Sequence, residues 1–175
     1  MKNYTAILEP DSIYHVYNRA NGNENLFYIP DNYDYFLQKY IQYIHPIAET
    51  FCYCLMPNHF HLLIRIKSED ELLNLTGLKN INANLTGLKN LSGLLSQQFS
   101  NLFNSYSKAI NKQQGRKGSL FIRPYKRKNI DSTFYLRKLV QYIHFNPIEA
   151  GLCYEPSKYK YSSYSALLSD SKTLL

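Results

Sequence analysis

The sequence contains no tryptophan, three cysteines and no long apolar run. Cys52, Cys54 and Cys153 are an odd, sparse set, unlike the disulfide framework of a small secreted domain. No apolar stretch is long enough to cross a bilayer, and the opening MKNYTAILEPDSIY lacks the hydrophobic region of a signal peptide. These absences predict a reduced protein with a cytoplasmic location.

Acidic residues are also few relative to basic ones. The chain has 20 Lys and Arg against 13 Asp and Glu, for a formal net charge of +7 and an isoelectric point near 9.2. A basic surface favours polyanions such as nucleic acid, but the charge alone fits an ordinary basic protein equally well. The 17 tyrosines offer ring faces for stacking on unpaired bases, although most are expected to serve in packing.

Length and patterning predict one globular domain spanning residues 1–175, with 45% hydrophobic and 19% charged residues. Alternating side chains predict strands at 13–19, 48–55 and 59–66, and a short strand at 119–122. Helical spacing predicts helices at 31–45, at 91–111 and from 131 or 132 to about 145. The turn Met56-Pro57-Asn58 makes the second and third strands a hairpin. This order predicts an α+β domain, an antiparallel sheet with helices mainly on one face.

Three further segments complete the chain. Residues 74–90 form a repeated insert, because NLTGLKN at 74–80 recurs at 84–90, and no chemistry is assigned to it. Pro147 is expected to end or kink the last helix, with one more turn closed by Gly151. The Tyr- and Ser-rich tail at 154–175 is expected to be extended.

The third predicted strand carries two histidines, His59 and His61. Because side chains alternate across a strand, both imidazoles lie on one face and can reach the same cation. The other face is fully apolar and is the predicted core, with Phe60, Leu62, Ile64 and Ile66. Taken alone, such a histidine pair is more often packed or solvated than bound to metal.

The last predicted helix adds polar chemistry beside its apolar stripe. Tyr142 and Asn146 lie one turn apart, on a face that also holds Tyr135 and Lys138. A tyrosine beside a metal-bound phosphate can attack phosphorus, and an amide oxygen one turn later can complete the metal shell. The alternatives are an ordinary packing tyrosine, and an asparagine that caps the turn beginning at Pro147.

Five motifs together resemble a known family. The segment LMPNHFHLLI at 55–64 resembles the HUH signature, and QYIHFNPIEAGL at 141–152 is similar to the tyrosine helix of single-tyrosine transposases. YHVYNR at 14–19, SLFIRPYK at 119–126 and YSSY at 161–164 add to the likeness, which covers nearly the whole chain in order. The likeness is greatest to the branch associated with repetitive extragenic palindromes (REP).

The resemblance implies a ferredoxin-like fold and a specific chemistry. His59, His61 and Asn146 would be metal ligands for Mg²⁺ or Mn²⁺, and Tyr142 the nucleophile. The family cleaves and rejoins single-stranded, hairpin-bearing DNA through a 5′-phosphotyrosine link, and some relatives work as homodimers that share active sites. Relatives usually carry a plainer helix where this chain has its repeat at 74–90.

The resemblance and the charge together indicate which basic residues are candidates for contacting DNA phosphates, although each one taken alone is more often a solvated surface charge. The run at 123–128, just before the tyrosine helix, is the strongest candidate. The full set is Arg19, Arg65, Arg116, Lys117, Arg123, Lys126, Arg127 and Lys128.

Two other functions fit parts of the sequence. A zinc-binding module would use Cys52, Cys54, His59 and His61, if the hairpin register puts all four on one face. A nucleic-acid-binding protein without catalysis, such as a domesticated transposase, would keep the basic surface. The presence of both histidines, the tyrosine and the amide argues against such degeneration.

Overall fold

The computed structural model describes residues 5–76 and 85–169. Its four strands, β1 (Ile13–Arg19), β2 (Ala48–Met56), β3 (His59–Ile66) and β4 (Lys126–Asn129), form an antiparallel sheet in the order β2-β3-β1-β4. The main helices are α1 (Pro30–Tyr43), α2 (Glu69–Thr76), α3 (Leu85–Gln113) and α4 (Thr133–Glu149). Strand order and connections are those of a ferredoxin-like fold, so the predicted α+β class is confirmed.

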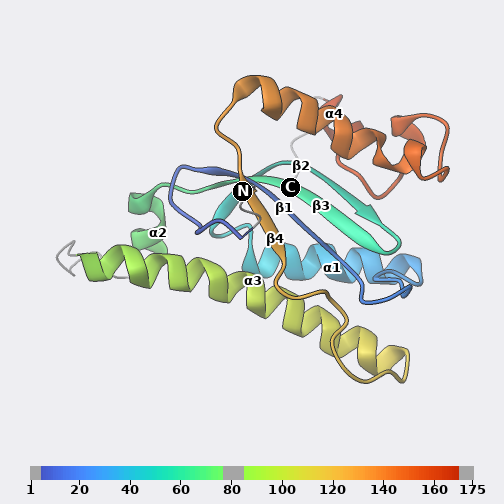
Figure 1. Ribbon diagram of the computed structural model, residues 1–175, viewed down its shortest axis with the longest axis horizontal. Coiled ribbons are helices and arrows are strands. Elements are labelled where there is room, and N and C mark those ends of the chain that lie inside the picture. Colours follow the sequence, from blue (N-terminus) through green and yellow to red (C-terminus); the bar gives the residue numbers. More distant parts are fainter. Residues whose placement is uncertain (1–4, 77–84, 170–175) are drawn as a thin grey trace.

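Helices lie on both faces of the sheet (Figure 1). The long helices α1 and α3 cover one face and pack against each other, while α4 crosses the other face. The main core lies on the α1 and α3 side, where all four apolar residues of β3 named above are buried as predicted. Full burial of each such side chain contributes about 1.5–3 kcal/mol to folding.

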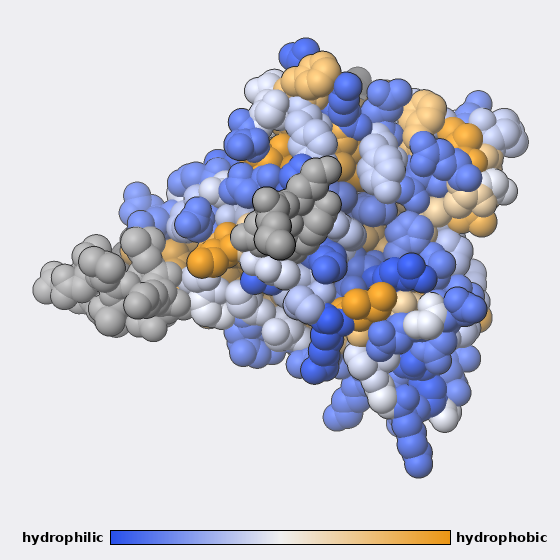
Figure 2. All heavy atoms as spheres, in the orientation of Figure 1, coloured by the Kyte–Doolittle hydropathy of each residue, from blue (hydrophilic) through white to orange (hydrophobic). Residues whose placement is uncertain are grey.

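A second, smaller core holds α4 against the sheet. Leu139 and Ile143 of α4 are 3% and 0% exposed, and they pack on Cys52, Cys54 and other buried residues of β2 and β3. The apolar stripe of α4 therefore fixes the helix on the face that carries the histidines. The outer surface seen in Figure 2 is mostly hydrophilic, with hydrophobic residues in small separate groups.

The fourth strand is not where the sequence pattern predicted it. In the segment 119–122, Phe121 makes only an isolated bridge with Ala20, whereas β4 lies in the basic stretch KRKN. Backbone pairing with β1 creates this strand, which has no apolar alternation to reveal it. Lysines are also usual on an edge strand, where they discourage pairing with other molecules.

Helix ends differ slightly from the expectations. Helix α1 begins at Pro30 and ends at Tyr43, two residues before the predicted end. The side chain of Asn32 accepts hydrogen bonds from the backbone N–H groups of Tyr28 and Ile29 at its start. Helix α4 is capped by Ser132 and continues through Pro147 to Glu149, and Gly151 follows with a φ of +70°.

The tail is folded back rather than simply extended. It forms a 3₁₀ turn, η1 (Pro156–Lys158), and a short helix, α5 (Tyr164–Leu167). Between them the backbone pairs with the free edge of β2: Leu55 N–H donates to Tyr161 O at 2.9 Å, and Ser163 N–H donates to Tyr53 O at 3.0 Å. These bonds correct the expectation of an extended tail. The tail folds back because the open edge of β2 supplies hydrogen-bond partners for the tail's backbone groups.

The repeat at 74–90 lies only partly within the described residues. Its first copy enters the end of α2 and its second copy the start of α3, while residues 77–84 lie outside the described part. Among the described residues, no helix has the length and apolar character needed to cross a membrane.

Candidate active site

The sheet face beneath α4 gathers the histidines and several lysines. On β1, alternation turns His15, Tyr17 and Arg19 toward this face, and their pairing partners on β3 are Leu63, His61 and His59 in turn. On the other side of β1, Lys126 pairs with Tyr17 and Lys128 with His15. The face therefore presents imidazoles from two strands beside cations from a third.

The two predicted histidines and Asn146 meet in space. His59 Nε2 lies 3.1 Å from Asn146 Oδ1, and His61 Nε2 lies 3.5 Å from Asn146 Nδ2. Asn146 follows His59 by 87 residues and His61 by 85 residues in the chain, and helix α4 brings it to both rings. Asn146 is 8% exposed and His61 5%, so this meeting point is largely shielded from water.

The Nδ1 atoms of both rings have partners of their own. His59 Nδ1 lies 2.6 Å from Asn58 Oδ1, and His61 Nδ1 lies 2.9 Å from His15 Nε2. If each ring carries its proton on Nδ1, the ring donates to that partner, and its Nε2 lone pair points toward Asn146. Such outer partners fix the orientation of metal-binding histidines.

Tyr142 lies next to this group. Its ring meets the ring of His61 edge-on, with centroids 5.4 Å apart, and its side chain is 43% exposed. It lines a hollow of about 430 Å³ together with His59, His61, Arg19 and Lys126, here called the metal-side hollow. Tyr142 is thus open to a ligand that also reaches both histidines.

Burial keeps the imidazoles neutral. It lowers the pKa of His15 to about 4, an effect to which the charge of Lys128 adds. Burial likewise lowers the pKa of His59, where Asn146 acts in the opposite sense, and holds that of His61 well below its usual value. At neutral pH these rings carry no charge, and their nitrogens offer lone pairs.

This donor set fits a divalent cation. Two neutral imidazole nitrogens and an amide oxygen supply three ligands without requiring any group to lose a proton. Fewer protein ligands than Mg²⁺ or Mn²⁺ needs would leave positions for phosphate oxygens and water.

The four ligands that the zinc-binding alternative requires are not grouped around one point in the described part of the chain. The register does put Cys54 opposite His61 and Cys52 opposite Leu63, on the histidine face. Nevertheless, the described part of the chain contains no group of three or more His, Cys, Asp or Glu side chains placed to hold a metal. Burial also raises the pKa of Cys52 to about 12, which opposes the thiolate that zinc binding requires.

The predicted phosphate-binding cations separate into groups. Arg19 and Lys126 line the metal-side hollow, and Lys128 lines a neighbouring one. Lys117 and Arg123 are exposed, and Arg123 borders a different hollow, against α3.

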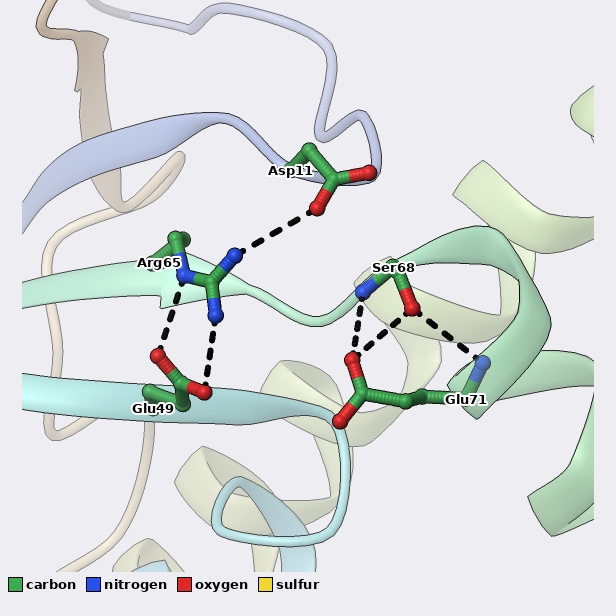
Figure 3. A network of polar contacts seen from close by, with 5 residues as sticks. All are labelled: Asp11, Glu49, Arg65, Ser68 and Glu71. Atoms are coloured by element: carbon green, nitrogen blue, oxygen red, sulfur yellow. Dashed lines mark hydrogen bonds and ion pairs between the residues drawn. The ribbon is translucent and has the colours of Figure 1, made fainter.

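Three other predicted cations are occupied by internal contacts. Arg65 donates two hydrogen bonds to Glu49, at 3.0 and 2.8 Å, and also pairs with Asp11 (Figure 3). Arg116 forms an ion pair with Glu24, and the guanidinium of Arg127 donates to the backbone of Ala6. Arg65 is also six residues along β3 from His59, roughly 20 Å. Arg65 and Arg116 are therefore weak candidates for DNA contact, because carboxylates already neutralise their charge.

Two residues near the histidines, His15 and Tyr17, were not predicted from the sequence to belong to the site. His15 is 6% exposed and contacts His61, while Tyr17 stacks on His15 with ring centroids 4.7 Å apart. The alternation of IYHVYNR already placed them on one face of a strand. Only the pairing of β1 with β3 brings that face next to His61.

Comparison with known proteins supports the fold. The sequence matches no protein-family model and no curated protein. A solved REP-associated tyrosine transposase bound to a REP hairpin aligns with a TM-score of 0.69 at 13% identity. The alignment covers 99% of this chain and 90% of that one. This chain shares the fold of that transposase. At such low identity the likeness concerns architecture, and residue roles must be argued from the site.

Proposed function

We propose that this protein is a metal-dependent transposase-like nuclease that cleaves and rejoins single-stranded, hairpin-bearing DNA through Tyr142. One observation carries the proposal: the Nε2 atoms of His59 and His61 converge on Asn146, and Tyr142 is one helical turn away. The fold shared with a transposase bound to a hairpin gives independent support.

The chain's own residues suit such a reaction. Tyr142 Oη gives up its proton to water and bonds to the scissile phosphorus, and the bond from phosphorus to the 3′-oxygen breaks. The leaving 3′-oxygen takes up a proton, and the 5′ end stays joined to Tyr142. Mg²⁺ or Mn²⁺, held by His59, His61 and Asn146, would polarise the phosphate and offset its growing charge. Arg19 and Lys126 supply further positive charge in the metal-side hollow.

Rejoining reverses these steps. The phosphotyrosine ester conserves the free energy of the broken bond, so that a free 3′-hydroxyl can attack it without ATP. All four proposed site residues come from one copy of the chain, so a homodimer is not needed to bring them together.

Incubation with hairpin-bearing single-stranded DNA and Mn²⁺ tests the chemistry. We expect a covalent protein–DNA adduct, visible as a shifted band under denaturing conditions and prevented by a chelator. Tyr142→Phe should abolish the adduct because it removes the attacking oxygen, while Tyr154→Phe, at a residue 78% exposed, should not. An undiminished adduct with Tyr142→Phe would refute the assignment of the nucleophile.

The histidine variants separate catalysis from binding. His59→Ala and His61→Ala should lose cleavage while keeping most of the DNA affinity, which a gel-shift assay measures. If the wild-type protein binds many hairpins but forms an adduct with none of them, the protein binds nucleic acid without catalysis.

A further inference from the structure

A second hollow borders Tyr142, and His59 is not among its lining residues. Its volume is about 410 Å³, and we call it the α4 hollow. It shares Tyr17, His61 and Tyr142 with the metal-side hollow. Its other lining residues are His15, Lys128, Tyr135, Lys138 and Leu139. The reaction described above uses neither Tyr135 nor Lys138.

The lining of the α4 hollow suits a nucleotide. Lys128 from β4 and Lys138 from α4 supply two positive charges, and no Asp or Glu is among the lining residues. The ammonium of Lys128 lies over one face of the Tyr135 ring, 3.9 Å from its centroid, so a base would stack on the opposite face. Cations that hold phosphates, next to rings that stack on bases, are the usual means of binding single-stranded nucleic acid.

The position of the two hollows gives the bound strand a direction. In a phosphoryl transfer the attacking and leaving oxygens lie roughly in line, on opposite sides of phosphorus. Both hollows contain His61 and Tyr142, but of the two only the metal-side hollow contains His59, so the leaving 3′-oxygen is assigned to it. The α4 hollow is lined by Tyr135, Lys138, Leu139 and Tyr142 of the helix that carries the nucleophile, so the strand that stays joined to Tyr142 is assigned to it.

We propose that the α4 hollow binds the nucleotide on the 3′ side of the scissile phosphate, with Lys128 and Lys138 on its phosphate and Tyr135 against its base. This inference rests on the proposed function. The site would hold the severed 5′ end in place while a new 3′-hydroxyl enters the metal-side hollow.

Binding of short oligonucleotides tests the site without any cleavage. The probes are five-residue oligothymidylates, one with a 5′-phosphate and one with a 3′-phosphate, added to the metal-free protein. We expect the 5′-phosphorylated probe to shift the NMR signals of the Leu139 methyls and the Tyr135 ring. Lys138→Gln should weaken its binding several-fold and reduce the slope of log K against log salt by about 0.7, the value for one phosphate contact on a single strand.

A matched variant controls for charge. Lys39→Gln makes the same change on α1, which packs on the opposite face of the sheet, and should leave the affinity and the salt slope unchanged. Equal binding by Lys138→Gln and the wild-type protein would overturn the proposal, as would equal shifts of Leu139 with the 3′-phosphorylated probe.

The adduct assay separates the two hypotheses. If the adduct forms on hairpin DNA but the signals of the α4 hollow do not move with the 5′-phosphorylated probe, only the nucleotide site is refuted. If those signals move with the expected selectivity and salt slope but no adduct forms, the site stands and the chemistry fails.

Discussion

At the scale of single residues, the candidate site depends on histidines that remain uncharged. His15 shows the cause most clearly. It lies on β1, the strand between β3 and β4, it is almost fully buried, and it has Lys128 as a neighbour. Its contact with His61 leaves the other nitrogen of that ring free to face Asn146. A charged His15 would disturb the ring that it orients.

The lowered pKa of His15 predicts a pH-dependent stability. The unfolded pKa is 6.5 and the folded pKa about 4, so the unfolded chain binds the proton more readily. This contribution to stability is complete above pH 6.5 and is lost as the pH falls toward 4. Between pH 7.5 and 4.5 the loss attributable to His15 is about 2–3 kcal/mol.

Urea unfolding with a chelator present measures this effect. His15→Gln has no titrating ring, so its free energy of unfolding should fall less than that of the wild-type protein over the same interval. Carboxylates contribute to both proteins alike, so the difference between the two slopes reports His15 together with the part of the His61 pKa shift that His15 causes. Parallel pH profiles would show that the environment of His15 does not oppose its protonation.

At the scale of elements, α4 is the part that assembles the site. One of its faces packs on β2 and β3 through Leu139 and Ile143, and its neighbouring face supplies Tyr142 and Asn146. The helix is anchored to the sheet by a small core, so its packing sets both its stability and the position of the two polar residues.

Truncating Ile143 should therefore weaken this attachment. Ile143 is 0% exposed, and Ile143→Ala should lower the free energy of unfolding by about 2–5 kcal/mol, with Ile143→Val costing about 0.5–1.5 kcal/mol. Leu168→Ala, at a residue 72% exposed, is the control and should change it little. Chemical denaturation provides all three values, and equal stability of the Ala and Val variants would contradict this account of the second core.

At the scale of the whole molecule, the tail closes one edge of the sheet. Tyr161 stacks on Tyr33 of α1 with ring centroids 3.6 Å apart, and its carbonyl accepts from the backbone of Leu55 on β2. A bare edge strand offers its backbone groups to other molecules. The tail thus acts as a cover for β2 and fixes it against α1.

Ending the chain after Lys158 should expose that edge. We expect a lower thermal midpoint and a mass that rises with protein concentration in sedimentation, since β2 becomes free to pair with another copy. Tyr161→Ala, which keeps the backbone bonds, should lower the midpoint without inducing association. A shortened chain that stays monomeric and equally stable would contradict this role of the tail.

The sequence by itself determined the elements whose periodicity is strong. Alternation in IYHVYNR and HFHLLIRI located β1 and β3 to the residue, and the spacing of Tyr142 and Asn146 put both on one helix. These features are local, because the period of side chains along a strand or helix depends only on its own backbone. That His59 and His61 lie on the same face of β3 followed from the same alternation.

The tertiary structure decided everything that depends on which segments meet. It placed β4 in a basic stretch without apolar alternation, because an edge strand is defined by pairing with β1. It brought His15 to His61 across two strands, and it neutralised Arg65 with Glu49 from the neighbouring strand. Each outcome joins residues 16 or more positions apart, and contacts of that range leave no periodic trace in the chain.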